Sequence, residues 1–463
     1  MVLRSRWYLT MASYVVVALA LIHLFQSATF GQIFNNAAAG VVVDAQGVLR
    51  VRSYQDPGGQ LTRQRIEQLR ATMDPDISRV SKLRKVSLTR LEAVIAERLA
   101  KGTGATDDMK YLAGMTQLQY VFYYPETRDI VIAGPAEGYV HDVSGRVRGM
   151  RSGRSVLELQ DLVVALRCFP PSGSETNVIS CSIDPTQEGL ARMQQFLHDI
   201  SGRIQPSDAE RIAQGLHESL GPHNVSIQGV SSASHFAQVL VEADYRMKLI
   251  GIGLEQPPVH MTTFIQKASP SDVARNALQR WYFVPDYETV RVSEDGYAME
   301  LIGEGVKLIS ENEMIAQDGG RVRADRVDRA SQAFARSFTQ KYAEIADHSP
   351  IYAQLRNLID MSIAAAFLQQ EDWYHAADWD APVFGDEAEF SVETYPVPQT
   401  VESAVNVVWK GSTLMTPIGG GVHIRPQEAL VSTNVQADDQ GDLQAERQKI
   451  AVPAQDPQRW WWD

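Results

Sequence analysis

The first part of the chain contains one long run without a charged side chain, and this run constrains the fold more than any other feature. Arg4 and Arg6 precede the run, and the next charged residue is Asp44. A basic start, an apolar stretch at 11–25 and small residues at 27–31 follow the order of a secretory signal. Because no second apolar run of this length follows, we expect the rest of the chain to fold as globular protein outside the cytosol.

Residues 1–31 are either a cleaved signal peptide or a signal anchor that stays in the membrane. The uncharged run from Trp7 to Phe25 is just long enough for an anchor, since a bilayer span takes roughly 17–25 apolar residues. Polar residues dilute it, so we favour cleavage after Gly31, although the site departs from the usual Ala-x-Ala pattern. In both cases we expect an exported protein, periplasmic or associated with the cell envelope, with at most one N-terminal membrane anchor.

Composition narrows the class of partner but not the activity. The chain has 463 residues, which is long for a single hydrophobic core, so more than one domain is expected. Its net charge of −13 argues against a nucleic-acid partner, because phosphate binding relies on clustered lysine and arginine. We therefore expect no nucleic acid, and a protein or envelope component as the partner.

Strand-type patterns recur along the chain. The alternation at 41–51 predicts a strand pair around a turn, and the aromatic and β-branched residues at 118–133 predict a hairpin. A third region, 289–309, predicts a β-meander with a turn at Glu294-Asp295-Gly296. These regions supply the expected sheets.

Helical spacing alternates with the strand patterns. Apolar residues three and four positions apart predict a helix at 88–99, with Ser87 as its N-cap, and further helices at 271–281 and 326–370. The sequence therefore predicts a mixed α/β (α+β) class. Sheet-and-helix layers are expected in the middle of the chain, and a β-meander plus a long helical hairpin towards the C-terminus.

Changes in periodicity and composition divide the chain into five parts. Apolar content falls after Pro426 and returns only at Trp460-Trp461-Trp462, which favours a disordered tail. The expected parts are a signal peptide or signal anchor at 1–31, an N-terminal strand pair and helices at 32–115, an α/β domain with the aromatic hairpin at 116–260, a β-meander and helical domain at 261–425, and the disordered tail at 426–463.

The two cysteines, Cys168 and Cys181, leave two alternatives open. In an exported protein they can form a disulfide across a short loop, which would stabilise the fold by roughly 3 kcal/mol if chain entropy is the cause. The alternative is a pair of buried thiols. We favour the disulfide, and we expect no metal on these cysteines because no histidine lies near them in the sequence.

The histidines and acidic residues predict no metal site and no cofactor. His217 and His223 lie close together, but they match no zinc-enzyme spacing and are interpreted as ordinary histidines at a helix end. Acidic residues crowd between Glu371 and Glu393, where aromatic residues interrupt them and the EF-hand order is absent. A solvated acidic loop held by aromatic side chains is favoured there over a calcium site.

Two glycine-containing stretches are candidate binding loops. The candidates are Gly134, Pro135 and Glu137 after the second strand of the aromatic hairpin, and Gly419, Gly420 and Gly421 near the end of the penultimate part. The second stretch lacks the lysine and hydroxyl of a phosphate-binding loop and is followed by a strand-like pattern. The alternative is a simple turn at the first stretch and closely approaching strands at the second.

Several unusual strings occur in a fixed order between residues 40 and 425. They are GVVVDA with GVLR at 40–50, DIVIAGPAEG at 129–138, ISCSIDPT at 179–186, VEADYRMK at 241–248, FVPDYETVRVSEDGYAMEL at 283–301, SPIYAQLRNLID at 349–360 and AVNVVWKGSTLMTPIGGGVHI at 404–424. In these strings the chain resembles an uncharacterised family of exported proteins, found mainly in planctomycete bacteria and known as a domain of unknown function. The resemblance implies no activity, cofactor or catalytic residue.

Taken together, the sequence predicts an exported envelope protein of unknown activity that is a non-enzymatic binding or structural module. The alternative is an envelope hydrolase whose site forms only in the fold, with His141, His217 or His260 as the base. A deep pocket that gathers a histidine, a carboxylate and a hydroxyl would favour the hydrolase. Flat surfaces with an exposed aromatic patch, such as one around Tyr120–Tyr124, would favour the binding module.

Overall fold

The computed structural model describes much of the chain after residue 39. The described residues are 40–52, 54, 56, 59–70, 72–173, 176, 178–200, 205–268, 277–286, 290–315, 321–323, 328–409, 413–415, 418–450, 452–453, 456 and 458–463. Ala38–Asp463 cluster as one unit. The predicted signal at 1–31 lies outside the described residues, and within them no helix has the length and apolar character needed to cross a membrane.

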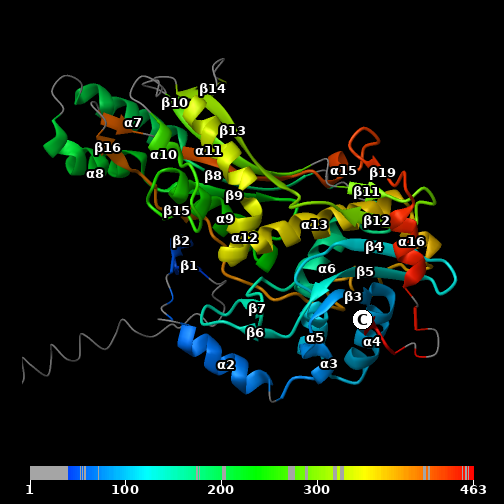
Figure 1. Cartoon of the computed structure of the whole chain (residues 1–463). Helices are drawn as coiled ribbons and strands as arrows, with labels where there is room; N and C mark the ends of the chain where they lie inside the picture. The colour runs from blue at the N-terminus through cyan, green and yellow to red at the C-terminus, as the bar shows by residue number, and fades with distance from the viewer. Residues whose placement is uncertain are drawn as a thin grey trace, which may run out of the picture. The chain divides into compact units, whose positions relative to one another are not determined.

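A mixed nine-stranded sheet forms one layer, in the order β1-β2-β15-β9-β8-β18-β10-β13-β14 (Figure 1). Its strands are β1 (Val41–Val43), β2 (Val48–Val51), β8 (Ile179–Asp184), β9 (His223–Gln228), β10 (Ala277–Pro285), β13 (Val306–Ile315), β14 (Arg321–Arg323), β15 (Thr400–Val401) and β18 (Ile418–Ile424). Strands β10 and β18 pair in parallel, whereas β8 is antiparallel to both β18 and β9. The antiparallel pairing of β1 with β2 confirms the predicted strand pair.

Strand β8 shows how the sequence decides which face of this sheet is covered. Ile179, Cys181 and Ile183 are buried, whereas Ser180 and Ser182 between them are half-buried on the opposite face. Side chains alternate between the two faces of a strand, so an apolar–polar alternation covers one face and leaves the other near solvent. The side chains on the buried face of β8 belong to the hydrophobic core.

A seven-stranded sheet forms a second layer, in the order β19-β11-β12-β4-β5-β3-β20. Its strands are β3 (Ser81–Ser87), β4 (Tyr120–Tyr124), β5 (Asp129–Ala136), β11 (Val290–Val292), β12 (Ala298–Leu301), β19 (Gln436–Ala437) and β20 (Trp461–Trp462). The antiparallel pairing of β4 with β5 confirms the predicted aromatic hairpin. The predicted meander is wrong in one respect, because β11 and β12 belong to this sheet but β13 pairs with β10 in the other.

Both faces of the β4–β5 hairpin are covered. Val121, Tyr123, Ile130 and Ile132 belong to the main core. On the other face Phe122, Tyr124, Val131 and Ala133 form a second apolar cluster that includes Leu443 and Trp462. Because residues from the end of the chain cover this face, the expected exposed aromatic patch around Tyr120–Tyr124 is not present.

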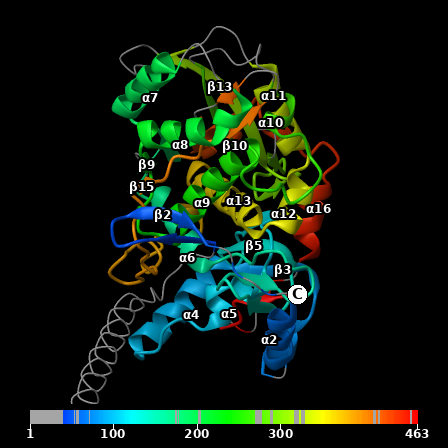
Figure 2. The ribbon, with the colours of Figure 1, turned by 90° about the vertical axis from the view of Figure 1, so that its left-hand side faces the viewer.

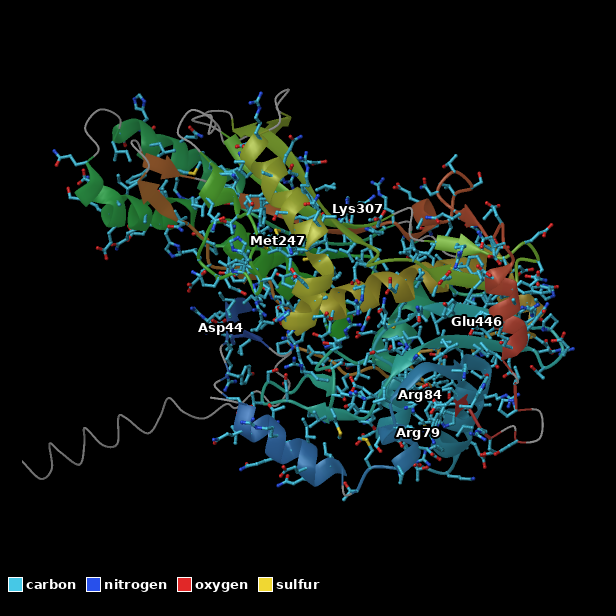
Figure 3. The ribbon with its side chains drawn as sticks, in the orientation of Figure 1. Asp44, Arg79, Arg84, Met247, Lys307 and Glu446 are labelled. Atoms are coloured by element: carbon cyan, nitrogen blue, oxygen red, sulfur yellow. The ribbon has the colours of Figure 1, made fainter. Side chains whose placement is uncertain are left out.

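The region 426–463 therefore differs from the expected disordered tail. It contributes α15 (Pro426–Ala429), β19, α16 (Asp442–Lys449) and β20, which pairs with Val86 and Lys85 of β3. Arg84, which is fully buried, donates from Nε and Nη2 to the Asp463 carboxylate over 2.9 and 3.1 Å. Figure 3 labels Arg84 and Arg79, and the Arg79 guanidinium lies 3.6 Å from the same carboxylate.

The helices lie mostly between strands in the sequence. The remaining ones are α2 (Gln60–Arg70), α3 (Pro75–Ser78), α4 (Leu88–Ala100), α5 (Asp107–Lys110), α6 (Leu159–Cys168), α7 (Gln187–Asp199), α8 (Ala209–Leu220), α9 (His235–Gly251), α10 (Phe264–Lys267), α11 (Arg329–Gln340), α12 (Tyr342–His348), α13 (Pro350–Gln370) and α14 (Trp373–Ala376). Two short 3₁₀ turns, η2 (Leu112–Gly114) and η3 (Pro206–Asp208), and two small ribbons, β6 (Tyr139–His141) with β7 (Val147–Gly149) and β16 (Val407–Trp409) with β17 (Thr413–Met415), complete the described elements.

Helices α9 and α13 form the centre of the molecule. Helix α9 packs on β8, β18 and β10, and its Met247, labelled in Figure 3, is fully buried. Helix α13 packs on α9, α6 and α12, and every residue from Ile351 to Leu368 is buried. Figure 1 shows α13 between the two sheets. The mixed α+β class predicted from the sequence is confirmed.

Two helix predictions need correction. Residues 277–281, expected at the end of a helix, belong to β10, where Trp281 and Phe283 are buried on one face and Tyr282 is half-buried on the other. The single helix expected at 326–370 is three helices in its described part, with breaks at Lys341 and at Ser349 before Pro350. Proline favours the first turn of a new helix, which explains the second break.

Candidate functional site

A hollow of about 420 Å³ opens between α8, α9 and the chain segment 402–405. One wall is apolar and consists of Tyr245 and Leu249 on α9 and the half-exposed Leu254 just after it. The polar side chains around the hollow are Glu210, Gln214, His217, Glu402 and Ser403. Figure 2 turns the side of the molecule with α8 and β15 towards the viewer. A ligand with an apolar part and a polar end matches this lining.

The sequence of α8 explains which of its side chains reach the hollow. Ile212, Leu216 and Leu220 are buried in a small apolar cluster shared with α7. Glu210 and His217 are seven positions apart, about two helical turns, and lie on another face that lines the hollow. An amphipathic helix thus places a carboxylate and an imidazole on the same face, about two turns apart, along the hollow.

His217 Nδ1 lies within hydrogen-bond range of two oxygen atoms of Ser403, and the assignment of its proton decides what this contact does. The His217 Nδ1 atom lies 2.9 Å from the Ser403 carbonyl oxygen and also 2.9 Å from Ser403 Oγ. A carbonyl oxygen only accepts hydrogen bonds, so Nδ1 carries the proton in this contact. It cannot then take a proton from the serine, and in the neutral ring Nε2 is the remaining acceptor.

Acidic groups give the hollow its charge. Glu402 accepts a hydrogen bond from Arg50 Nη1 at 2.6 Å, and both side chains are about half exposed, so solvent screens this pair. Burial raises the pKa of the Tyr245 hydroxyl, and the nearby Glu402 raises it further. The phenol is therefore a neutral hydrogen-bonding group at neutral pH.

Gly419, Gly420 and Gly421 lie in strand β18 rather than in a loop. A Cβ atom on Gly421 would lie 1.8 Å from the Cys181 carbonyl oxygen. A Cβ atom on Gly420 would lie 2.0 Å from the Trp281 carbonyl oxygen. These glycines let β18 lie against β8 and β10, which is the structural alternative considered for them.

A buried ion pair ties α9 to the same strands. Lys248 Nζ donates to Asp244 Oδ2 at 2.8 Å, to the Ile183 carbonyl at 2.8 Å and to the Gly420 carbonyl at 3.1 Å. Burial raises the pKa of Asp244 to about 6, and Lys248 opposes the shift. Parts of three strings, strand β8, the end of α9 and strand β18, therefore meet at the middle of the nine-stranded sheet, where they hold the fold together.

The first glycine-containing stretch is also part of the framework. Gly134 and Pro135 belong to β5, and a Cβ atom on Gly134 would lie 2.0 Å from the Gln117 carbonyl oxygen. Glu137 is buried and accepts hydrogen bonds from the backbone amides of Arg151 and Ser152 at 2.8 and 2.9 Å. The Glu137 carboxylate thus fixes a turn instead of facing a ligand.

The favoured disulfide between Cys168 and Cys181 is not formed, and both side chains are buried thiols. Cys181 faces the core from the middle of β8, opposite Val422. Cys168, at the end of α6, approaches the Gly229 carbonyl oxygen at 3.2 Å. Burial raises the pKa of the Cys168 thiol to about 12 and that of Cys181 well above its usual value, so neither is a thiolate at neutral pH.

Of the three histidines considered as hydrolase bases, only His217 lines the hollow. His141 is exposed, and its Nε2 lies 2.9 Å from the Tyr111 hydroxyl. His260 is exposed in the chain between α9 and α10. The structure thus brings a histidine, carboxylates and a hydroxyl together at the hollow, and the proton assigned to His217 Nδ1, not the distance, argues against an activated serine.

Sequence reasoning missed a second constellation, built from Glu158, Asp161 and His235. Their ligand atoms all lie within 4.8 Å of one another, and this is the group of the described residues that could hold a metal ion. Burial opposes protonation of His235, yet Asp161 and Glu158 raise its pKa to about 9, while burial raises the pKa of Glu158. The Glu-x-x-Asp spacing was visible in the sequence, but its nearness to His235 was not.

Comparison with known protein families gives a match for part of the chain. Residues 181–264, from β8 to the first residue of α10, match a family described as a protein of unknown function (DUF1598). No curated protein matches the chain, and no solved structure matches it either. The matched segment contains α8, α9 and all three residues of the apolar wall of the hollow.

Proposed function

We propose that this chain is an exported, non-enzymatic binding protein whose hollow receives the basic side chain of a protein partner. The observation that carries the proposal is the lining of the hollow, which combines the apolar wall of Tyr245, Leu249 and Leu254 with the carboxylates of Glu210 and of Glu402, the second of which also pairs with Arg50. Lysine and arginine have a long apolar stem and a cationic end, so they suit such a lining. The net charge of −13 attracts a basic partner over a longer range.

The contact between His217 and Ser403 supports a binding role over a hydrolytic one. Its Nδ1 proton is directed at the Ser403 carbonyl oxygen, which leaves the serine hydroxyl without a base at this nitrogen. A neutral His217 instead offers Nε2 as an acceptor for a cationic hydrogen-bond donor. Histidine, carboxylates and phenol then act together as acceptors around one positive group.

Export belongs to the same proposal and rests on the sequence of residues 1–31, together with the resemblance over residues 40–425. If the signal is cleaved, protein isolated from native cell envelope begins at Gln32, which N-terminal mass spectrometry detects directly. An intact N-terminus in the membrane fraction would establish the anchor instead. Recovery of full-length protein only from the cytosol would contradict export.

Peptide titration tests the hollow. A short peptide alternating leucine and lysine should bind, while the same peptide with glutamate for lysine should not, as measured by calorimetry. Glu210→Lys should weaken binding about fivefold, since removing one favourable exposed charge contact changes the free energy by about 1 kcal/mol. Glu188→Lys, an exposed position on α7 away from the hollow, is the charge-matched control. If both variants weaken binding equally, the effect comes from the net charge of the protein and the hollow is not the binding site.

A hydrolase is the second candidate, because the hollow gathers His217, a carboxylate and the Ser403 hydroxyl. A panel of ester, peptide and glycoside substrates tests it. We expect no turnover above the background of a Ser403→Ala variant. Turnover that disappears in Ser403→Ala, with the fold retained, would replace the binding proposal by the hydrolase.

A further inference from the structure

We propose that Glu158 and His235 bind a divalent transition-metal ion of the zinc type, with Asp161 orienting the histidine. The three residues come from two helix starts that lie far apart in the sequence. Glu158 is the N-cap of α6, and Asp161 lies in its first turn. His235 is the first residue of α9, whose N-cap Ser234 accepts a hydrogen bond from the Ala237 amide. Both helix starts hold their side chains in fixed positions.

Asp161 fixes the orientation of the imidazole. Its Oδ2 and Oδ1 atoms lie 2.8 and 3.1 Å from His235 Nδ1, so Nδ1 carries the proton and donates it to the carboxylate. A metal ion that binds at Nε2 displaces the proton from this nitrogen and uses the lone pair left there. This is the arrangement in which metal-binding histidines are held, with the second ring nitrogen donating to a carboxylate.

Nε2 faces Glu158 across a gap that suits an ion better than a hydrogen bond. The distance from His235 Nε2 to Glu158 Oε1 is 3.8 Å, beyond hydrogen-bond range. Two ligands of a tetrahedral zinc ion, each about 2.0–2.1 Å from the metal, lie roughly 3.4 Å apart. A shift of a few tenths of an ångström therefore brings both atoms into ligand positions.

The centre contains an unused buried acceptor. Gln160 Nε2 donates to Glu158 Oε2 at 2.7 Å, while Gln160 Oε1 is buried and accepts no hydrogen bond. His235 itself is only 7% exposed, and no hydrogen bond is formed by its Nε2 among the described residues. His235 Nε2 is therefore available as a ligand atom, and a buried polar atom without a partner, such as Gln160 Oε1, is costly.

An aromatic ring packs beside the centre, and the nearby arginine is engaged elsewhere. The Tyr395 ring lies 5.7 Å from the His235 ring between centroids, and the Tyr395 hydroxyl donates to Glu393 at 3.1 Å. The nearby Arg146 is already paired with Glu242 at 2.6 Å. Once the metal has displaced the Nε2 proton, with both carboxylates ionised, the three side chains carry two negative charges, which a divalent ion neutralises. The imidazole nitrogen favours zinc or cobalt over calcium, which prefers oxygen ligands only.

Metal titration of the full chain tests this inference. After treatment with a chelator and its removal, zinc chloride alone is titrated by calorimetry, and cobalt chloride is followed by its visible absorption. We expect one equivalent to bind, His235→Gln to abolish binding, and Asp161→Asn to weaken it about 10- to 100-fold. His260→Gln, an exposed histidine in a loop, is the matched control and should bind like the parent.

A thermal melt keeps the inference testable if His235→Gln fails to fold. Zinc should raise the melting temperature of the parent, a chelator should reverse the rise, and Glu158→Gln should lose the shift while keeping its circular dichroism. A parent without zinc binding and without a zinc-dependent shift overturns the inference. Undiminished binding in a folded His235→Gln or Glu158→Gln variant overturns it as well.

Discussion

Strands β4 and β18, in the middle of the two sheets, make their packing contacts in opposite ways: β4 through large side chains and β18 through its backbone. In β4, Phe122 and Tyr124 fill one face and Val121 and Tyr123 the other, so large side chains make the contacts. In β18, residues 419–421 carry no side chain, and neighbouring backbones occupy the space where Cβ atoms would lie. Strand β4 should therefore be sensitive to lost volume and β18 to added volume.

Removing volume from β4 should have the largest effect. Phe122→Ala should lower the free energy of unfolding by about 3–5 kcal/mol, because its ring is fully buried between Tyr120, Tyr124 and the C-terminal residues. Urea unfolding measures the loss. Ser182→Ala, on the half-buried face of β8, should stay within about 0.5 kcal/mol of the parent. If Phe122→Ala lowers the free energy of unfolding as little as Ser182→Ala does, large side chains do not hold β4 in place.

Adding volume to β18 should have a smaller but clear effect. Gly421→Ala should cost about 1–3 kcal/mol, because its Cβ atom would lie 1.8 Å from the Cys181 carbonyl oxygen and force β8 and β18 apart. Gly104→Ala is the control, since no heavy atom lies within 4 Å of its Cβ position. Equal unfolding curves for the two variants would contradict the close approach of the strands.

The pH dependence of stability tests the helix that packs between the two layers. Burial raises the pKa of Asp360 on α13 to about 8, with Arg356 opposing the shift and Glu304 adding to it. In the unfolded chain the pKa is near 3.9, so between about pH 4 and 8 the folded state keeps a proton that the unfolded state releases. The free energy of unfolding should therefore fall as pH rises, by at most about 1.4 kcal/mol per pH unit from this group.

Asp360→Asn should remove this contribution and be more stable than the parent at pH 8. Urea unfolding at pH 5, 6.5 and 8 gives the difference between parent and variant at each pH. Because α13 is buried between the sheets, far-UV circular dichroism and tryptophan fluorescence should report a single transition. A difference that stays constant across this range would show that Asp360 is ionised in the folded state.

Local patterns in the sequence were enough to predict much of the secondary structure. The N-cap at Ser87 and the helix after it are confirmed, as is the hairpin of β4 and β5. Residues 277–281 were mistaken for a helix because Ala274, Leu278 and Trp281 are four and three positions apart and so also fit helical spacing. The pairing of β10 with both β13 and β18 decides the strand instead, and this pairing depends on residues far along the chain.

The candidate sites were largely hidden from sequence reasoning for the same reason. The hollow combines His217 of α8 with Ser403, and the proposed metal centre combines Glu158 with His235. Each pair is separated by dozens of residues or more, and no local spacing encodes such a contact. The glycines at 419–421 show the opposite case: their motif was visible, but its purpose became clear only from the backbones beside them.

The pairing of β20 with β3 has a consequence for how the chain folds. Arg84 and Asp463 are 379 positions apart, so this edge of β3 is covered only after residues 461–463 have been synthesised. Until then β3 offers unpaired backbone groups to any other extended chain. Such a long-range closure is slow to form. Nascent or truncated chains that lack residues 461–463 should therefore associate through β3, because the pairing of β20 with β3 otherwise protects this edge from self-assembly.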